Sequence, residues 1–182
     1  DVKSTTFLSA TLRIENSFNR MKKHLGQENA KEFLIPPVFD LKRQTKIFAL
    51  RDMGRYDDPA YIKNISRFIY ETCRKLGGHI LVLFNNNIRR NGVYEELEML
   101  TRGSKIEVHT NKKAISILND KNRQVVILGT KGFFEGIDVP GDGLSCVMLD
   151  KLPNHSPEYP ILRAVTTYQH KMYQDFNYPQ LC

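Results

Sequence analysis

The most regular hydrophobic pattern of the chain lies between residues 58 and 78. Apolar side chains recur there at spacings of three and four, which places them on one face of a helix; they are Tyr61, Ile62, Ile65, Phe68, Ile69, Cys73 and Leu76. Asp58 is a suitable N-cap and Pro59 suits a first helical turn, whereas Gly77 and Gly78 suit a helix end. The pattern predicts a long amphipathic helix.

Runs of consecutive apolar residues follow this helix and indicate buried strands. His79–Phe84 and Val125–Leu128 are nearly continuous apolar runs, as in strands that are covered on both faces, and Leu144–Leu149 is a third run of this kind. Helical patterns separate these strands along the chain. Alternating strands and helices form right-handed crossover units, so the sequence predicts an α/β fold with a mostly parallel central sheet.

Weaker patterns complete the expected layout. Further strands are expected at Thr6–Leu8, Lys46–Leu50 and Ile106–Val108. Further helices are expected from Ser17 to Gly26, at 93–100, at Lys112–Leu118 and at Ile161–Tyr173. No internal repeat and no low-complexity segment interrupts this order.

The composition is that of an ordinary globular protein. The 182 residues suffice for one domain with a proper core, and no apolar run approaches the length that crosses a bilayer. Three widely spaced cysteines suit free thiols in a reducing compartment, so we expect a cytoplasmic protein without a membrane contact. The net charge of +7 raises the prior for a nucleic-acid partner, although scattered basic pairs are also typical of a solvated surface.

Polar residues follow two of the buried strands directly. Asn85, Asn86 and Asn87 come after His79–Phe84, and Gly129 to Gly132 come after Val125–Leu128. Ligands of parallel sheets bind at the carboxyl ends of the strands. Exposed amides with the Thr130 hydroxyl and the Lys131 ammonium suit a phosphate, although the same residues suit a tight turn with a surface lysine.

The residues after this turn combine aromatic and acidic side chains. Of Phe133 and Phe134, one is expected to pack inward, and the other is free to stack on a base or to fill an interface. Glu135 and Asp138 lie three positions apart without a metal-ligand pattern. Asp138 precedes Val-Pro-Gly, so a hydrogen bond to its own turn is the simpler role for it.

Other chemistries find little support in the sequence. There is no GxSxG elbow, no HExxH pair, no Cys-His spacing typical of zinc and no G-x-x-x-x-G-K-[ST] phosphate loop. His79 lies inside a predicted strand and is expected to be a core or edge histidine with satisfied hydrogen bonds, not a ligand. The sequence thus predicts no metal ligands.

Four segments together resemble the motifs of one helicase family. FLSATL at 7–12 resembles motif III of superfamily 2 helicases, and LVLFNN at 81–86 resembles motif IV. GTKGFFEGIDVPG at 129–141 resembles motif V in the form of the DinG and XPD (Rad3-related) branch, and KLPNHSP at 151–157 is similar to the stretch that follows it there. The four segments also follow one another in the order and with the spacing of the family's motifs. The resemblance implies a second RecA-like motor domain, a three-layer α/β/α fold, in an ATP-dependent DNA helicase associated with DNA repair.

The resemblance implies roles in coupling and in the nucleotide cleft. Ser9 and Thr11 match the motif that couples ATP hydrolysis to strand movement. Glu135, Gly136 and Asp138 would face the cleft that binds ATP with Mg²⁺. The two acids would orient groups there without binding phosphate directly, because like charges repel.

The resemblance also implies a track for single-stranded DNA. Asn85, Asn86, Thr130 and Lys131 would touch its phosphate backbone. The first RecA-like domain of the same protein would be the second partner. An iron-sulfur cluster, which this branch often carries in its first domain, would not involve the three cysteines of this chain, and its presence is left open.

The chain departs from the family pattern at three places. Three asparagines replace the commoner Thr-Ser or Ser-Ser after motif IV, and Asn154 stands where the branch usually has Phe. The arginine-bearing motif VI is absent, since the sequence stops at Cys182. We therefore expect residues 1–16 to be the tail of a first motor domain with a linker, and residues 17–182 to be a second domain truncated before motif VI. This piece alone is expected not to hydrolyse ATP.

A second class of function stays open from the sequence. A RecA-like relic that binds nucleic acid or a protein without ATP turnover would keep much of the same fold. Loss of the Walker motif and motif VI from the whole protein would identify such a relic. An RNA or duplex DNA track is a further alternative.

Overall fold

The computed structural model describes residues 3–14, 16–153, 160 and 163. The chain divides into two compact units, one made of Asp1–Ile47 with Asn154–Cys182 and the other of Phe48–Pro153. The expected boundary after residue 16 and the expected helix at Ile161–Tyr173 stay predictions; most of that helix lies outside the described residues. No helix within the described ranges is long and apolar enough to cross a membrane.

The first unit contains two short helices in its described part. They are α1 (Asn19–His24) and α2 (Leu41–Gln44). The strands expected at Thr6–Leu8 and Lys46–Leu50 are wrong, because both segments are irregular and largely exposed. A short apolar run becomes a strand only where a neighbour supplies hydrogen bonds, and no strand pairs with either run in the described part of the chain.

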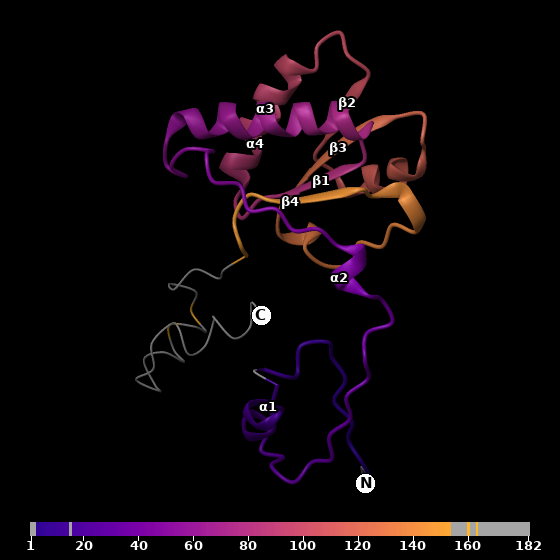
Figure 1. Cartoon of the computed structure of the whole chain (residues 1–182). Coiled ribbons are helices and arrows are strands. Elements are labelled where there is room, and N and C mark those ends of the chain that lie inside the picture. The colour runs from indigo at the N-terminus through magenta and orange to yellow at the C-terminus, as the bar shows by residue number, and fades with distance from the viewer. Residues whose placement is uncertain (1–2, 15, 154–159, 161–162, 164–182) are drawn as a thin grey trace. The chain divides into compact units, whose positions relative to one another are not determined.

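The second unit is an α/β domain with the predicted alternation of elements. In chain order these are α3 (Pro59–Leu76), β1 (Ile80–Leu83), α4 (Asn87–Leu100), β2 (Ile106–His109), η1 (Lys112–Asn119), β3 (Gln124–Gly129), η2 (Lys131–Phe133), η3 (Gly141–Gly143) and β4 (Cys146–Leu149). The four strands form a sheet in the order β2-β3-β1-β4, and every pair is parallel (Figure 1). The predicted RecA-like α/β class is confirmed.

Helix α3 forms for the reasons that its sequence indicates. The Asp58 carboxylate accepts a hydrogen bond from the Ala60 amide at 2.8 Å, Pro59 starts the helix, and Gly77 ends it with a φ of 77°. Helix α4 begins earlier than expected, at Asn87, because the side chain of Asn86 caps it. The segment expected as a helix at Lys112–Leu118 is helical, but it forms the 3₁₀ helix η1.

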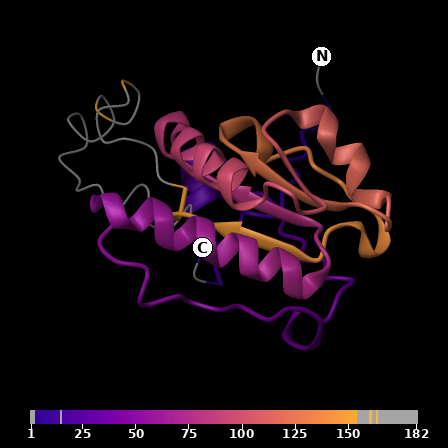
Figure 2. The ribbon, with the colours of Figure 1, turned by 90° about the horizontal axis from the view of Figure 1, so that it is seen from above.

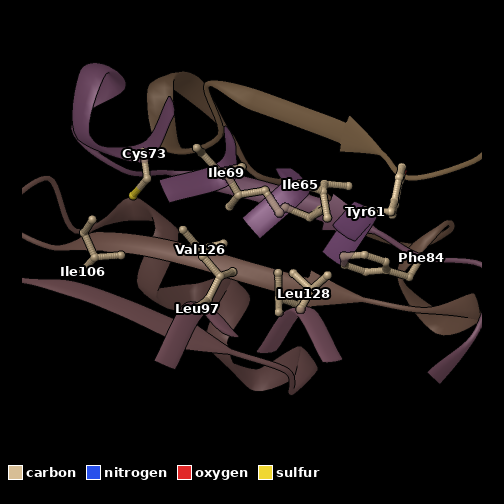
Figure 3. Close-up of a cluster of buried hydrophobic side chains, with 12 residues drawn as sticks. Tyr61, Ile65, Ile69, Cys73, Phe84, Leu97, Ile106, Val126 and Leu128 are labelled. Carbon is tan, nitrogen blue, oxygen red and sulfur yellow. The ribbon is translucent and has the colours of Figure 1, made fainter. Parts of the chain in front are cut away.

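The sheet separates two apolar clusters. Alternate residues of each strand point to opposite faces, so β1 sends Ile80 and Val82 toward α3 and α4 but Leu81 and Leu83 toward η1 and η2. Helices α3 and α4 lie side by side over the first face (Figure 2). Figure 3 shows Ile65 and Ile69 of α3 directed at β3. Each such buried side chain contributes about 1.5–3 kcal/mol.

Strand β4 is an edge strand and is less buried than its apolar sequence suggests. It begins at Cys146, two residues later than expected, and Val147 and Leu149 are about half exposed, at 53% and 49%. It pairs with β1 on one side, and no strand among the described residues pairs with its other side. The free thiol of Cys73, on the inner face of α3, is buried as predicted, whereas that of Cys146 is half-buried. Cys182 lies outside the described residues.

One tight contact fixes the chain as it leaves β3. Phe133, the buried aromatic of the pair, packs its side chain onto the backbone of Gly129, whereas Phe134 is half-buried. A Cβ atom at Gly129 would lie 2.5 Å from the Cβ of Phe133 and 2.9 Å from its Cδ1. Only glycine leaves room for this ring.

We therefore predict that Gly129→Ala lowers the free energy of unfolding by about 1–3 kcal/mol, the usual cost of overpacking. Chemical denaturation of the chain measures this. Gly132→Ala is the matched control, because a Cβ there meets nothing within 4 Å. Equal denaturation midpoints for the two variants would contradict the role of Gly129.

Candidate functional site

The exits of three strands lie next to one another at the carboxyl edge of the sheet. The Phe84 amide, just after β1, donates to the Gly129 carbonyl at 2.9 Å, and the Asp150 amide, just after β4, donates to the Leu83 carbonyl at 3.0 Å. Asn85, Thr130 and Asp150 therefore begin three adjacent loops. This is the edge at which parallel sheets bind ligands.

The two asparagines after β1 already have structural partners. The Asn86 side-chain oxygen accepts from the Arg89 amide at 2.9 Å and so caps α4. The Asn85 side-chain nitrogen donates to the Leu152 carbonyl at 3.0 Å. Both residues lie at the predicted edge, but each is tied to the protein by one polar atom.

The loop after β3 turns its apolar residues inward and its charged residues outward. Ile137 and Val139 pack with the two phenylalanines against the second apolar cluster. Thr130 is half-buried, and the predicted site residues Lys131, Glu135, Gly136 and Asp138 are exposed. One continuous loop thus presents an ammonium and two carboxylates to solvent and carries a half-buried hydroxyl at its start.

Lys112, which the sequence did not single out, holds this loop. Its ammonium donates to the carbonyls of Gly132 at 2.9 Å and of Glu135 at 3.3 Å. Gly136, with a φ of 66°, follows at once, and a Cβ there would lie 3.8 Å from the same ammonium. The cation therefore fastens the middle of the loop to η1.

A buried polar network lies behind the exits of β1 and β4. The Asp150 side chain is fully buried, and one of its oxygens accepts a hydrogen bond from the Tyr61 hydroxyl at 2.8 Å. Its other oxygen lies 3.9 Å from Nε of Arg89. The guanidinium carbon of Arg89 lies 3.6 Å from the centre of the Tyr56 ring and 4.9 Å from that of Tyr61. The sequence signal for this network was an acid directly after an apolar strand.

Burial dominates the electrostatics of this network. It raises the pKa of Asp150 above its ordinary value, against the opposing effects of the Tyr61 hydroxyl, Tyr56, Arg89 and Lys151. It also raises the pKa of Tyr61, and the nearby Asp150 charge adds to that shift. Tyr61 therefore stays a hydrogen-bond donor across the physiological range.

The predicted coupling residues belong to the other compact unit. Both Ser9 and Thr11 are exposed, and their hydroxyl oxygens lie 3.2 Å apart, within hydrogen-bonding distance. The Thr11 amide also donates to the Ser9 hydroxyl at 3.2 Å. The two side chains form one local turn.

No metal cage is present in the described part of the chain. It contains no group of three or more His, Cys, Asp or Glu side chains close enough to share an ion. His79 has the structural role that was expected for it. Its Nδ1 lies 2.8 Å from the Leu118 carbonyl oxygen, within hydrogen-bonding distance.

An all-parallel α/β domain with polar loops at its carboxyl edge is the class that fold and site define. Comparison with protein families matches residues 69–181 to the family described as the helicase C-terminal domain. The chain belongs to this family, and the sequence-based resemblance to a C-terminal domain of DinG- and XPD-like helicases is confirmed.

Curated relatives agree with this assignment. The chain is similar to the ATP-dependent DNA helicase YoaA of Escherichia coli K12, at 28% identity over 88% of the chain and 26% of the relative. It is also similar to the 3'-5' exonuclease DinG of Bacillus subtilis 168, at 30% identity over 88% of the chain and 18% of the relative. The chain thus spans about a quarter or less of the length of these relatives.

The two hydrogen bonds from Lys112 predict a change in loop dynamics. Lys112→Met keeps the aliphatic stem and removes the donors, so amide hydrogen exchange at Phe133 and Phe134 should become faster by about two- to tenfold, as expected for the loss of one exposed contact. Lys113→Met, an exposed neighbour on the same turn, should leave it unchanged. Equal exchange in both variants would show that Lys112 does not hold the loop.

The raised pKa of Asp150 predicts how stability depends on pH. The folded state binds this proton more tightly than the unfolded state, so the contribution of Asp150 is most favourable below its unfolded pKa of 3.8 and is lost as pH rises through the higher folded pKa. Asp150→Asn does not titrate. The melting temperature of the native chain relative to this variant should therefore fall as pH rises from about 4. A difference that grows with pH would show that the hydrogen bonds and cations around the carboxylate outweigh burial, and a constant difference would show that the two balance; either result contradicts the raised pKa.

Proposed function

We propose that this chain acts as the second RecA-like motor domain of a longer ATP-dependent DNA helicase. In that protein it supplies one wall of the ATP cleft and part of the track for single-stranded DNA. The observation that carries the proposal is the loop after β3, which presents Thr130 and Lys131 near its start and Glu135 and Asp138 further on. Membership of the helicase C-terminal family supports the assignment.

The proposed DNA track runs along the carboxyl edge of the sheet. Lys131 supplies a cation and Thr130 a hydroxyl, and Asn85 supplies an amide group, all of which bind phosphate oxygens. Asn86 contributes through the start of α4, whose first amides its side chain helps to order. Since such contacts release counterions, binding should weaken steeply with salt.

The proposed nucleotide wall comprises Glu135, Gly136 and Asp138. Two exposed carboxylates suit Mg²⁺, which prefers oxygen ligands, but two acids on one loop make no complete site. Mg²⁺ keeps several waters and phosphate ligands, so these residues fit a role in orienting the water shell of an ion that ATP carries. The ion would neutralise charge on the phosphates. The small Gly136 lets the backbone approach the ligand.

The remaining parts of the proposal concern the whole protein. Ser9 and Thr11 couple hydrolysis to strand movement, residues 1–16 link the first motor domain to this one, and that first domain is a partner. The sequence lacks a phosphate-binding loop and motif VI, so we propose that this chain alone does not hydrolyse ATP. A reducing cytoplasm suits its free thiols.

A second candidate function follows from the name of one relative. The Bacillus subtilis relative is called an exonuclease, so a helicase-like region can belong to a protein named for nuclease chemistry. The second candidate is therefore that this chain serves such a protein as a nucleic-acid-binding module without ATP turnover. Measuring ATP hydrolysis separates the two candidates.

The test is ATP hydrolysis by the full-length protein that contains this chain, with and without single-stranded DNA. We expect DNA to stimulate hydrolysis and Asp138→Ala to lower the stimulated rate by roughly tenfold to a hundredfold, the range for residues that orient the ligands of a metal. Asp142→Ala is the control, because this exposed acid pairs only with the exposed Lys121 among the described residues.

Three results would change the proposal. No hydrolysis under any condition would favour the binding module. DNA-stimulated hydrolysis with a fully active Asp138→Ala variant would keep the motor and remove Asp138 from its cleft. Binding of the native chain to DNA that is unaffected by salt would contradict the track.

A further inference from the structure

The buried network at the carboxyl edge joins the exits of β1 and β4. Arg89 lies in the first turn of α4, and its backbone amide donates to the side chain of Asn86. Its guanidinium donates to the Tyr56 carbonyl and lies 3.9 Å from the Asp150 carboxylate. One side chain therefore connects the start of α4, the loop before α3 and the end of β4.

A second contact joins the same two exits on the surface. The Asn85 side chain donates to the Leu152 carbonyl, two residues beyond Asp150. Asn85 itself lies one residue before the cap of α4. The position of the Asn85 amide group thus depends on how far the exit of β1 stands from the segment that contains Lys151 and Leu152.

Stability does not explain why charges occupy this place. Burying a charged pair costs about as much as its attraction returns, and well-packed apolar residues often do as well. Here Nε of Arg89 and one oxygen of Asp150 are buried without a hydrogen-bond partner in the part of the chain that the structure describes. Arg89 and Asp150 nevertheless have side-chain exposures of only 15% and 0%.

Directional contacts, in contrast to apolar packing, fix orientation as well as distance. The Tyr61 hydroxyl sets the direction of the Asp150 carboxylate, and the Tyr56 ring sets the plane of the Arg89 guanidinium. Both constraints act directly behind the loops of the carboxyl edge. Exposed Lys151, whose ammonium lies 5.1 Å from the centre of the Tyr56 ring, extends from the same place.

We propose that Arg89 and Asp150 are positioning residues for the strand track. Through the exits of β1 and β4 they set where Asn85 and Lys151 meet a phosphate backbone. This inference rests on the proposed function, since it concerns the same track. It adds residues that do not touch the DNA but determine how the contacts are aligned.

The experiment combines DNA affinity with a local structural readout on the same chain. Binding of a single-stranded oligothymidylate is measured over a range of salt concentrations, and the NMR signals of the Asn85 side-chain amide are followed without DNA. Arg89→Lys keeps the charge but loses the planar stack, and Asp150→Asn keeps the shape but loses the charge. Each should weaken binding by about two- to thirtyfold, the range for residues that act through others. Each should also shift the Asn85 signals.

Two matched controls separate this effect from loss of charge or of a hydroxyl. Arg90→Lys makes the same change one residue further on, where the guanidinium contacts Asn91. A third network variant, Tyr61→Phe, removes the hydroxyl that donates to the carboxylate and the carbonyl of Asp150, and it decides the outcome if a charge variant does not fold. Tyr70→Phe is its matched control. Both controls should leave binding and the Asn85 signals unchanged.

The outcomes distinguish this inference from the proposed function. If the native chain binds DNA in a salt-dependent way but the folded network variants bind equally well, with unchanged Asn85 signals, the positioning role is overturned and the track stands. If the variants only lower the melting temperature, the network is merely structural and the inference is likewise overturned. If the native chain does not bind DNA at low salt, the track itself fails, and the positioning role with it.

Discussion

The parallel register of β1 between β3 and β4 is the constraint on which the candidate site depends. Leu83 pairs with Gly129 on one side and with Leu149 on the other, so three strands end at the same level. The loops that follow are far apart in sequence but begin as neighbours. A slip of one residue would turn every buried side chain of β1 to the opposite face, so the two apolar clusters protect the alignment of the loops.

The loop after β3 combines two demands in a short sequence. Phe133 and its apolar neighbours anchor it to the core, which explains the aromatic pair, and Gly129 admits the ring. Charged residues between these anchors remain exposed. Lys112 adds a polar fastening from η1 through two backbone carbonyls. An anchored loop presents its charges at low cost in conformational entropy, which suits repeated binding and release.

Sequence patterns predicted the parts whose stability is local or follows a simple period. Nearby residues determine the start and end of α3 and the burial of β1 and β3. They also place the polar loops at the carboxyl edge of the sheet. The strands expected at Thr6–Leu8 and Lys46–Leu50 failed because pairing depends on a distant partner. The Asp150 network was missed for the same reason: its bond to Tyr61 spans 89 positions. No periodicity reveals a contact between a helix start and a strand end.

The distribution of charge at this edge also bears on how the domain works. Exposed cations and amides attract a polyanion, whereas the buried Asp150 carboxylate adds a negative charge beneath them. Its cost is partly offset by Arg89 and the Tyr61 hydroxyl, which keep that charge directed inward. The cations and amides of this edge therefore lie over a directional polar framework in the interior. In the proposed motor, a track that releases its strand in every cycle would benefit from this division, because aligned contacts give specificity for a backbone without tight binding.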